Sequence, residues 1–200
     1  MMKITSIKQQ VKRAGRYSVF VDGEYSFSLS ETALLDSKIT SGQELTLEQV
    51  GEFQQLSADD KIYNQTLRYI ALRPRTKWEI EVYLNKKDAS PTLLETTLNK
   101  LSNVGLIDDN KYAQSFVNDR RLLRPSSRRK IVNDLRKKHI PSVIIEEVVG
   151  SESEDEQSAL KAIIERKRQQ TKYQDDLKLM QYLARQGFNY GDIKDALKED

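Results

Sequence analysis

Basic side chains crowd into one short stretch of this chain. Residues 120–138 contain nine lysines or arginines and a single acid, Asp134. Cations at this density concentrate the phosphates of a nucleic acid or a strongly acidic protein surface around them. The candidate binding residues in this stretch are Arg120, Arg121, Arg124, Arg128, Arg129, Lys130, Arg136 and Lys137.

The dipeptide Arg-Pro occurs twice, as Arg73-Pro74 and Arg124-Pro125, each time six residues from Pro to the next core position. Because proline suits the first turn of a helix and disrupts a helix interior, each element is expected to end one helix and begin the next. One interpretation is a plain helix junction whose cation favours the helix dipole. The other is a set of basic residues that faces one side for binding, and it adds the candidates Arg73, Arg75 and Lys77.

The helix expected over residues 127–138 carries its cations in two rows. Arg129 and Arg136 lie seven residues apart, and Lys130 and Lys137 repeat that spacing, so both rows are expected on the exposed side. Asp134 lies four residues from Lys130 and from Lys138, which predicts ion pairs with them along the helix.

Residue types exclude most catalytic chemistry. The chain has no cysteine and one histidine, which removes thiolate sites and most zinc and triad arrangements. His139 is in register with Asp88 and Gly187 after a leucine-bearing helix, so it is expected in a left-handed turn. We therefore expect no catalytic, cofactor-binding or metal-binding residue. Trp78 is expected to pack against a neighbouring helix, with stacking on a base as the alternative.

An apolar pattern that recurs about every fifty residues predicts the elements that position these cations. Positions four apart share a helix face, so each copy predicts one helix, a short turn and a second helix, and a helical pattern ahead of each copy adds a third. Three tandem three-helix repeats result, in an elongated, curved array suited to large partners. The three copies are Ile80, Leu84, Leu94 and Leu98; Ile131, Leu135, Ile145 and Val149; and Leu179, Leu183, Ile193 and Leu197.

The first sixty residues follow a different pattern. Asp22-Gly23 favours a two-residue hairpin turn between strands at 16–21 and 24–29, with a third strand expected at 3–12. Thr46 and Gln49 predict a capping box for a covering helix, and residues 57–60 are expected to form a polar junction that caps the next helix. The fold class is therefore mainly α with a small hairpin-containing module. The predicted divisions are residues 1–60, 61–108, 109–152 and 153–200.

Composition restricts the cores and the location. With 38% apolar and 32% charged residues, the chain can fill several small cores but not one large core. No run approaches the roughly 18 apolar residues of a membrane span, and the start lacks a signal-peptide core, so a cytoplasmic protein is expected. Residues 61–150 hold 18 basic and 10 acidic residues, whereas both flanking segments are slightly acidic. The positive field is therefore localised in the middle of the chain.

Two motifs in the middle of the chain occur in a fixed order. They are the segment Arg73-Pro74-Arg75-Thr76-Lys77-Trp78-Glu79-Ile80 and the later Gly105-Leu106-Ile107-Asp108-Asp109, followed by Tyr112-Ala113. Together they resemble the motifs of the bacterial RecX regulatory family. The resemblance covers roughly residues 61–200, and the hairpin module is similar to the extension of longer members. It implies a non-enzymatic regulator in the SOS response and DNA repair that lodges in the groove of the RecA–DNA filament. It further implies damped filament growth, ATP hydrolysis and strand exchange.

Other functions stay open beside that resemblance. A basic helical array could bind DNA or RNA directly, and weaker, charge-driven contacts with single- and double-stranded DNA are expected in either case. An enzyme is the remaining alternative, although no nucleophile–base pair, metal cluster or phosphate-binding glycine loop is present in the sequence. We expect a monomer with no membrane partner.

Overall fold

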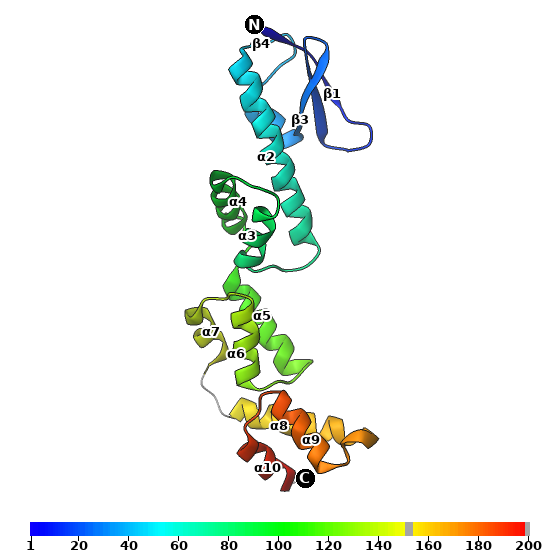
Figure 1. Cartoon of the computed structure of the whole chain (residues 1–200), viewed down its shortest axis with the longest axis vertical. Helices are drawn as coiled ribbons and strands as arrows, with labels where there is room; N and C mark the ends of the chain where they lie inside the picture. Colours follow the sequence, from blue (N-terminus) through cyan, green and yellow to red (C-terminus); the bar gives the residue numbers. More distant parts are fainter. Residues whose placement is uncertain (151–153, 199–200) are drawn as a thin grey trace. The chain divides into compact units, whose positions relative to one another are not determined.

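The computed structural model describes residues 1–150 and 154–198, which fall into two compact units. The first unit comprises Met1–Arg73 with Ile80–Asn103, and the second comprises Pro74–Glu79 with Val104–Asp200. Figure 1 labels the helices and strands of both units.

The first unit begins with a four-stranded antiparallel sheet of order β3-β2-β1-β4. Asp22 and Gly23 both have positive φ, 51° and 90°, which confirms the predicted hairpin turn. Phe20 lies opposite Tyr25 across this hairpin, with ring centroids 6.2 Å apart. The strands are β1 (Met2–Gln9), β2 (Arg16–Val21), β3 (Glu24–Ser30) and β4 (Glu44–Leu45).

Two helices complete this module, a short α1 (Glu31–Ser37) and a long α2 (Leu47–Ala71). Thr46 and Gln49 form the predicted capping box at the start of α2. Figure 1 shows α2 alongside β3 and extending beyond the sheet. The shared core consists of Ile4, Val19, Val21, Phe27, Leu29, Ile39, Leu45 and Val50.

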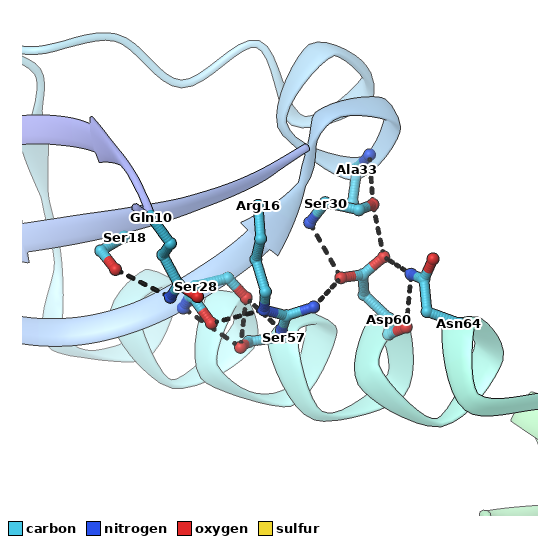
Figure 2. Close-up of polar contacts among 9 residues, drawn as sticks. All are labelled: Gln10, Arg16, Ser18, Ser28, Ser30, Ala33, Ser57, Asp60 and Asn64. Carbon is cyan, nitrogen blue, oxygen red and sulfur yellow. Dashed lines mark hydrogen bonds and ion pairs between the residues drawn. The ribbon is translucent and has the colours of Figure 1, made fainter. Parts of the chain in front are cut away.

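The prediction of a helix junction at residues 57–60 is wrong, because α2 continues through this segment. Figure 2 shows that these polar side chains fasten α2 to the sheet instead. Ser57 Oγ donates to the Ser28 carbonyl at 2.6 Å. Asp60 accepts from the Arg16 guanidinium at 3.1 Å and from Ser30 Oγ at 2.6 Å. Side chains with oxygen atoms can form hydrogen bonds to an adjoining strand as well as cap a helix. The sequence pattern does not distinguish these two roles.

The remainder of the first unit packs the end of α2 with α3 (Lys77–Asn85) and α4 (Pro91–Asn103). The Tyr69 and Tyr83 rings stack at 4.2 Å between centroids. The buried apolar residues of this region include Ile70, Ile80, Leu84, Leu98 and Leu101.

The second unit contains two three-helix bundles in tandem. The second repeat has its core around Ala113, Val117, Ile131, Leu135, Ile145 and Val149, and the third has its core around Leu160, Ile163, Leu179, Leu183 and Ile193. The second repeat comprises α5 (Asp109–Leu122), α6 (Arg128–Lys137) and α7 (Ser142–Val149). The third comprises α8 (Glu154–Arg168), the 3₁₀ turn η1 (Thr171–Tyr173), α9 (Asp176–Arg185) and α10 (Tyr190–Lys198).

The repeat register predicted from the apolar spacing is confirmed. Ten of its twelve positions are buried, and the other two, Leu94 and Leu197, are half-buried. Asp88, His139 and Gly187 all have positive φ, as predicted for the turn after the middle helix. The fold is therefore mainly helical, with three-helix domains and a small antiparallel strand module ahead of them.

Candidate polyanion-binding surface

The helix α6 carries the centre of the basic stretch. Ser127 caps it, because its side-chain oxygen accepts the backbone N–H of Lys130 at 3.1 Å. Ile131 and Leu135 anchor its inner face at 4% and 0% exposure. Because this face is buried, most of the cations of α6 point outward. The spacing of the two buried apolar residues therefore positions the basic surface.

Two cations of the stretch fold back onto their own repeat. Arg120 pairs with Asp134 at 3.3 Å and lies over the Phe116 ring at 4.9 Å. Arg121 donates to the Val149 carbonyl at 3.2 Å. The predicted ion pairs of Asp134 with lysines along α6 are wrong, because the Asp134 carboxylate pairs with Arg120 of α5 instead.

Three more cations hold neighbouring segments together. Arg128 Nε donates to the Gly150 carbonyl at 2.8 Å. Lys130 is half-buried and donates to the Gln186 side chain, so this row does not lie wholly in solvent as predicted. Lys138 pairs with Glu79 at 2.8 Å. Five of the nine cations thus have structural partners within the chain.

The other four cations of residues 120–138 face solvent. Within residues 1–150 and 154–198, they make no side-chain hydrogen bond or ion pair. Their positive charge is consequently available to a polyanion without breaking an internal contact. These free cations are Arg124, Arg129, Arg136 and Lys137.

The candidates from the first Arg-Pro element are divided between the two units. Arg73 ends the segment assigned to the first unit, whereas Arg75 and Lys77 belong to the second. Lys77 is exposed, Arg75 is half-buried, and the Lys77 backbone N–H donates to Asp109 Oδ1 at 2.9 Å. Burial of Asp109 raises the pKa of its carboxyl group, although this hydrogen bond acts in the opposite direction. Asp108 caps α5, and the Lys111 N–H lowers its pKa.

The turn that follows α6, residues Lys138 and His139, makes a contact that we call the Trp78 junction. Here the rings of Trp78 and His139 stack at 4.0 Å between centroids, and Lys138 pairs with Glu79 beside them. The sequence predicts that Trp78 packs against a neighbouring helix, but its ring stacks on a residue of the turn after α6 and remains 36% exposed. His139 therefore has a second role besides the left-handed turn that its register predicted.

The first turn of α6 makes the corresponding contact with the third repeat, which we call the Gly187 junction. Ser127 Oγ donates to the Gln186 carbonyl at 2.9 Å, and Lys130 reaches the Gln186 side chain. A Cβ at Gly187 would overlap the side-chain oxygen of Ser127, so any larger residue at this position would displace that side chain. In the repeat register, Gly187 replaces His139 and Arg129 replaces Trp78.

A groove of about 730 Å³ adjoins the Gly187 junction. It brings three predicted cations of α6 together with Tyr190, whose side chain is 62% exposed. The arginines and the tyrosine could engage phosphates and a base, respectively. The sequence pattern did not predict the groove residues of the third repeat. The change from His139 to Gly187 at equivalent turns was a signal that could have indicated them. The lining comprises Arg128, Arg129, Val132, Asn133, Arg136, Glu156, Gly187, Phe188, Asn189, Tyr190 and Asp192.

In the described part of the chain, no group of three or more histidine, aspartate or glutamate side chains could hold a metal ion. No helix there is both long enough and apolar enough to cross a membrane.

The chain is similar to known proteins along its whole length. Family models match residues 2–46 as the regulatory protein RecX N-terminal domain, 108–149 as the RecX second three-helix domain and 154–197 as the RecX third three-helix domain. The regulatory protein RecX of Lactobacillus delbrueckii subsp. bulgaricus (strain ATCC BAA-365 / Lb-18) is 30% identical over 100% of this chain and 75% of its own length. That of Lactobacillus johnsonii is 31% identical over 76% of this chain, and the match spans only 56% of that relative.

Solved structures give the same result. A crystal structure of regulatory protein RecX superimposes with a TM-score of 0.76 and 28% identity, covering 100% of both chains. A crystal structure of RecX from Lactobacillus salivarius gives a TM-score of 0.59 at 25% identity over 71% of this chain and 96% of the other. Sequence models, relatives and structures agree, and the chain therefore belongs to the RecX family of regulatory proteins.

Proposed function

We propose that this protein is a non-enzymatic regulator of homologous recombination and DNA repair that acts on the RecA recombinase. It binds in the groove of the RecA–DNA filament and inhibits or modulates filament growth, ATP hydrolysis and strand exchange. Relatives that carry the name regulatory protein RecX support the regulatory role. The protein acts as a monomer in the cytoplasm, where it meets the filament.

The observation that carries this proposal is the set of free cations on the second repeat. Arg124, Arg129, Arg136 and Lys137 lie in solvent, so a filament rich in phosphates and carboxylates can pair with them directly. Cations already bonded within the chain, such as Arg120 and Lys138, hold the repeats in place and contribute less to binding. The proposal thus divides the predicted site into a binding set and a structural set.

Co-sedimentation with preformed RecA–DNA filaments at a series of salt concentrations tests the proposal. Wild-type protein should sediment with filaments and slow strand exchange, and its affinity should fall steeply with salt. The triple variant Arg124→Glu, Arg129→Glu and Arg136→Glu should keep its helical circular dichroism and lose filament binding. Each lost phosphate contact should reduce the slope of log K against log salt by about 0.9.

A matched charge reversal in the third repeat provides the control. Lys161, Lys194 and Lys198 are exposed like the three arginines, but they lie in a slightly acidic segment. Their reversal to glutamate should leave sedimentation within about twofold of wild type, because surface charges outside an interface contribute little. Equal loss from both triple variants would mean that overall charge, rather than the surface of the second repeat, drives association.

Direct binding to nucleic acid is a second candidate function, which the groove beside Tyr190 favours. Exposed aromatic rings next to arginines bind single strands by stacking and by phosphate contacts. Binding of single-stranded DNA at one fixed salt concentration, with and without RecA, separates the two functions. If RecA adds nothing to the affinity, direct nucleic-acid binding explains the surface and the filament proposal fails.

A further inference from the structure

The helix α5 ends in two adjacent leucines that face solvent. Leu122 is 80% exposed and Leu123 is 67% exposed. Across residues 1–150 and 154–198, no other pair of adjacent large apolar side chains is exposed in this way. Exposed leucines that stand singly are common on protein surfaces, whereas a contiguous pair indicates a contact surface.

Helix periodicity makes the exposure of these leucines more informative. The inner face of α5 runs through Ala113 and Val117, so the next inward positions are those of Arg120 and Arg121. Both arginines bond inward, to Asp134 and to a carbonyl of α7, and the leucines that follow are left outside. Arg121 stays exposed despite this bond, so the last turn of α5 presents the leucine pair and one arginine to solvent.

The same corner occurs in the first repeat. Leu72 is 80% exposed and directly precedes Arg73-Pro74, as Leu123 directly precedes Arg124-Pro125. The third repeat has Thr171 at the corresponding position, followed by Lys172, so it lacks both the leucine and the proline. An exposed leucine therefore accompanies the Arg-Pro element in both repeats that have one.

We propose that the corner Leu122-Leu123-Arg124 is an anchor for a protein partner. The two leucines enter an apolar pocket on that protein, and Arg124 pairs with carboxylates at the rim of the pocket. This arrangement matches the apolar centre and charged rim of protein interfaces. Arg124 is exposed, and only its backbone carbonyl is bonded to a side chain, since it accepts from Ser126 Oγ at 3.0 Å. Among the described residues its guanidinium has no partner, so it is available for such a pair.

A nucleic acid does not provide the surface that the leucines require. Its exterior presents phosphates and sugars, which bind cations but offer little apolar area to two adjacent leucines. The inference rests on the proposed function and sharpens it: the corner contacts the protein subunits of the filament, and the free arginines of α6 contribute long-range charge. Loss of the leucines should therefore weaken binding to the filament and leave binding to naked DNA unchanged.

The test compares the double variant Leu122→Ser, Leu123→Ser with the matched control Val143→Ser, Leu177→Ser. The control residues are 72% and 70% exposed but stand singly. Each protein is measured in sedimentation with RecA–DNA filaments and in binding to naked single-stranded DNA at the same salt concentration. Circular dichroism and thermal unfolding verify that both variants fold. The leucine variant should lose filament affinity at least about tenfold and keep its DNA affinity, whereas the control should retain both.

Three results would overturn the inference. A leucine variant that binds filaments within about twofold of wild type shows that the corner is not an anchor. A variant that loses filament and DNA binding together places the leucines on nucleic acid. Wild-type protein that fails to sediment with filaments rejects the proposed function as well, so the two failures are distinguishable.

Discussion

The two ends of α6 use the same repeat geometry for different purposes. At the Trp78 junction an aromatic stack and an ion pair fill the space beside the turn. At the Gly187 junction a glycine leaves room for the Ser127 side chain, the neutral side chain of Gln186 accepts a hydrogen bond from Lys130, and a groove lined by arginines adjoins the contact. The difference teaches that two substitutions in register can convert a closed contact into an open, basic surface.

The largest expected effect comes from a change that removes support from both junctions. Leu135 is fully buried in the core of the second repeat, on the inner face of α6. Leu135→Ala should lower the free energy of unfolding by about 2–5 kcal/mol, because it leaves a cavity that the packed helices cannot refill. Chemical denaturation measures the loss.

Lys137→Ala is the control for this change, since its side chain is exposed on the same helix. It should alter the unfolding free energy by less than about 0.5 kcal/mol. A Leu135→Ala effect as small as that of the control would contradict the repeat register on which both junctions depend.

The repeats were predictable because apolar spacing determines which residues are buried. Ile131 and Leu135 recur at fixed intervals in the other repeats, and burial of an apolar face leaves helices little choice of register. The continuity of α2 was not predictable in the same way. From the sequence alone, Asp60 could have capped a new helix. In the structure, Arg16 and Ser30 of the sheet donate hydrogen bonds to it, so Asp60 links α2 to the sheet instead.

The next largest effect on the free energy of unfolding is expected from a substitution at Gly187. Gly187→Ala places a methyl group against Ser127 Oγ at a left-handed φ of 92°, so the free energy of unfolding should fall by roughly 2 kcal/mol. Thermal and chemical unfolding of the purified variant measure the change. The groove beside the junction should also widen or distort, which the affinity for single-stranded DNA would report.

A double-mutant cycle with Ser127→Gly separates overlap from backbone strain. Glycine is tolerated as a helix cap at a cost of a few tenths of a kcal/mol, and it removes the oxygen that the new methyl group would meet. The double variant should recover part of the loss, which gives a favourable coupling energy. Strictly additive effects would show that Ser127 is not the neighbour that requires glycine at position 187.

The binding surface was less predictable than the fold because a cation's partner lies in tertiary structure. Lys130 and Lys137 have equivalent spacing on α6, yet one is half-buried against the third repeat and the other is exposed. Charge density assigns the proposed surface to the second repeat, but it did not reveal that Arg120 and Lys138 have acidic partners. Those partners come from other helices, and local sequence spacing carries no information about them.

The ion pair of the Trp78 junction should have a smaller effect. Glu79 is 10% exposed and Lys138 is 34% exposed in their side chains, so solvent partly screens the attraction. Glu79→Gln should reduce the free energy of unfolding by about 1 kcal/mol, and Lys138→Met should cost a similar amount. The coupling between them, measured in a double-mutant cycle, should be about 0.5–1 kcal/mol. A coupling near zero would leave the aromatic stack as the main contact of this junction.

The smallest net effect is expected at His139, where two contributions oppose each other. His139→Gly relieves a left-handed φ of 55°, which favours the variant, but it removes the ring that stacks on Trp78, which costs about 0.5–1.5 kcal/mol. The free energy of unfolding should therefore change by less than about 1 kcal/mol. The chain has one tryptophan and one histidine, so the fluorescence of Trp78 reports the stack without interference. Its emission should change in His139→Gly even where stability does not. Unaltered emission in a folded variant would show that the stack does not persist in solution, and the two junctions would then differ less than their geometry indicates.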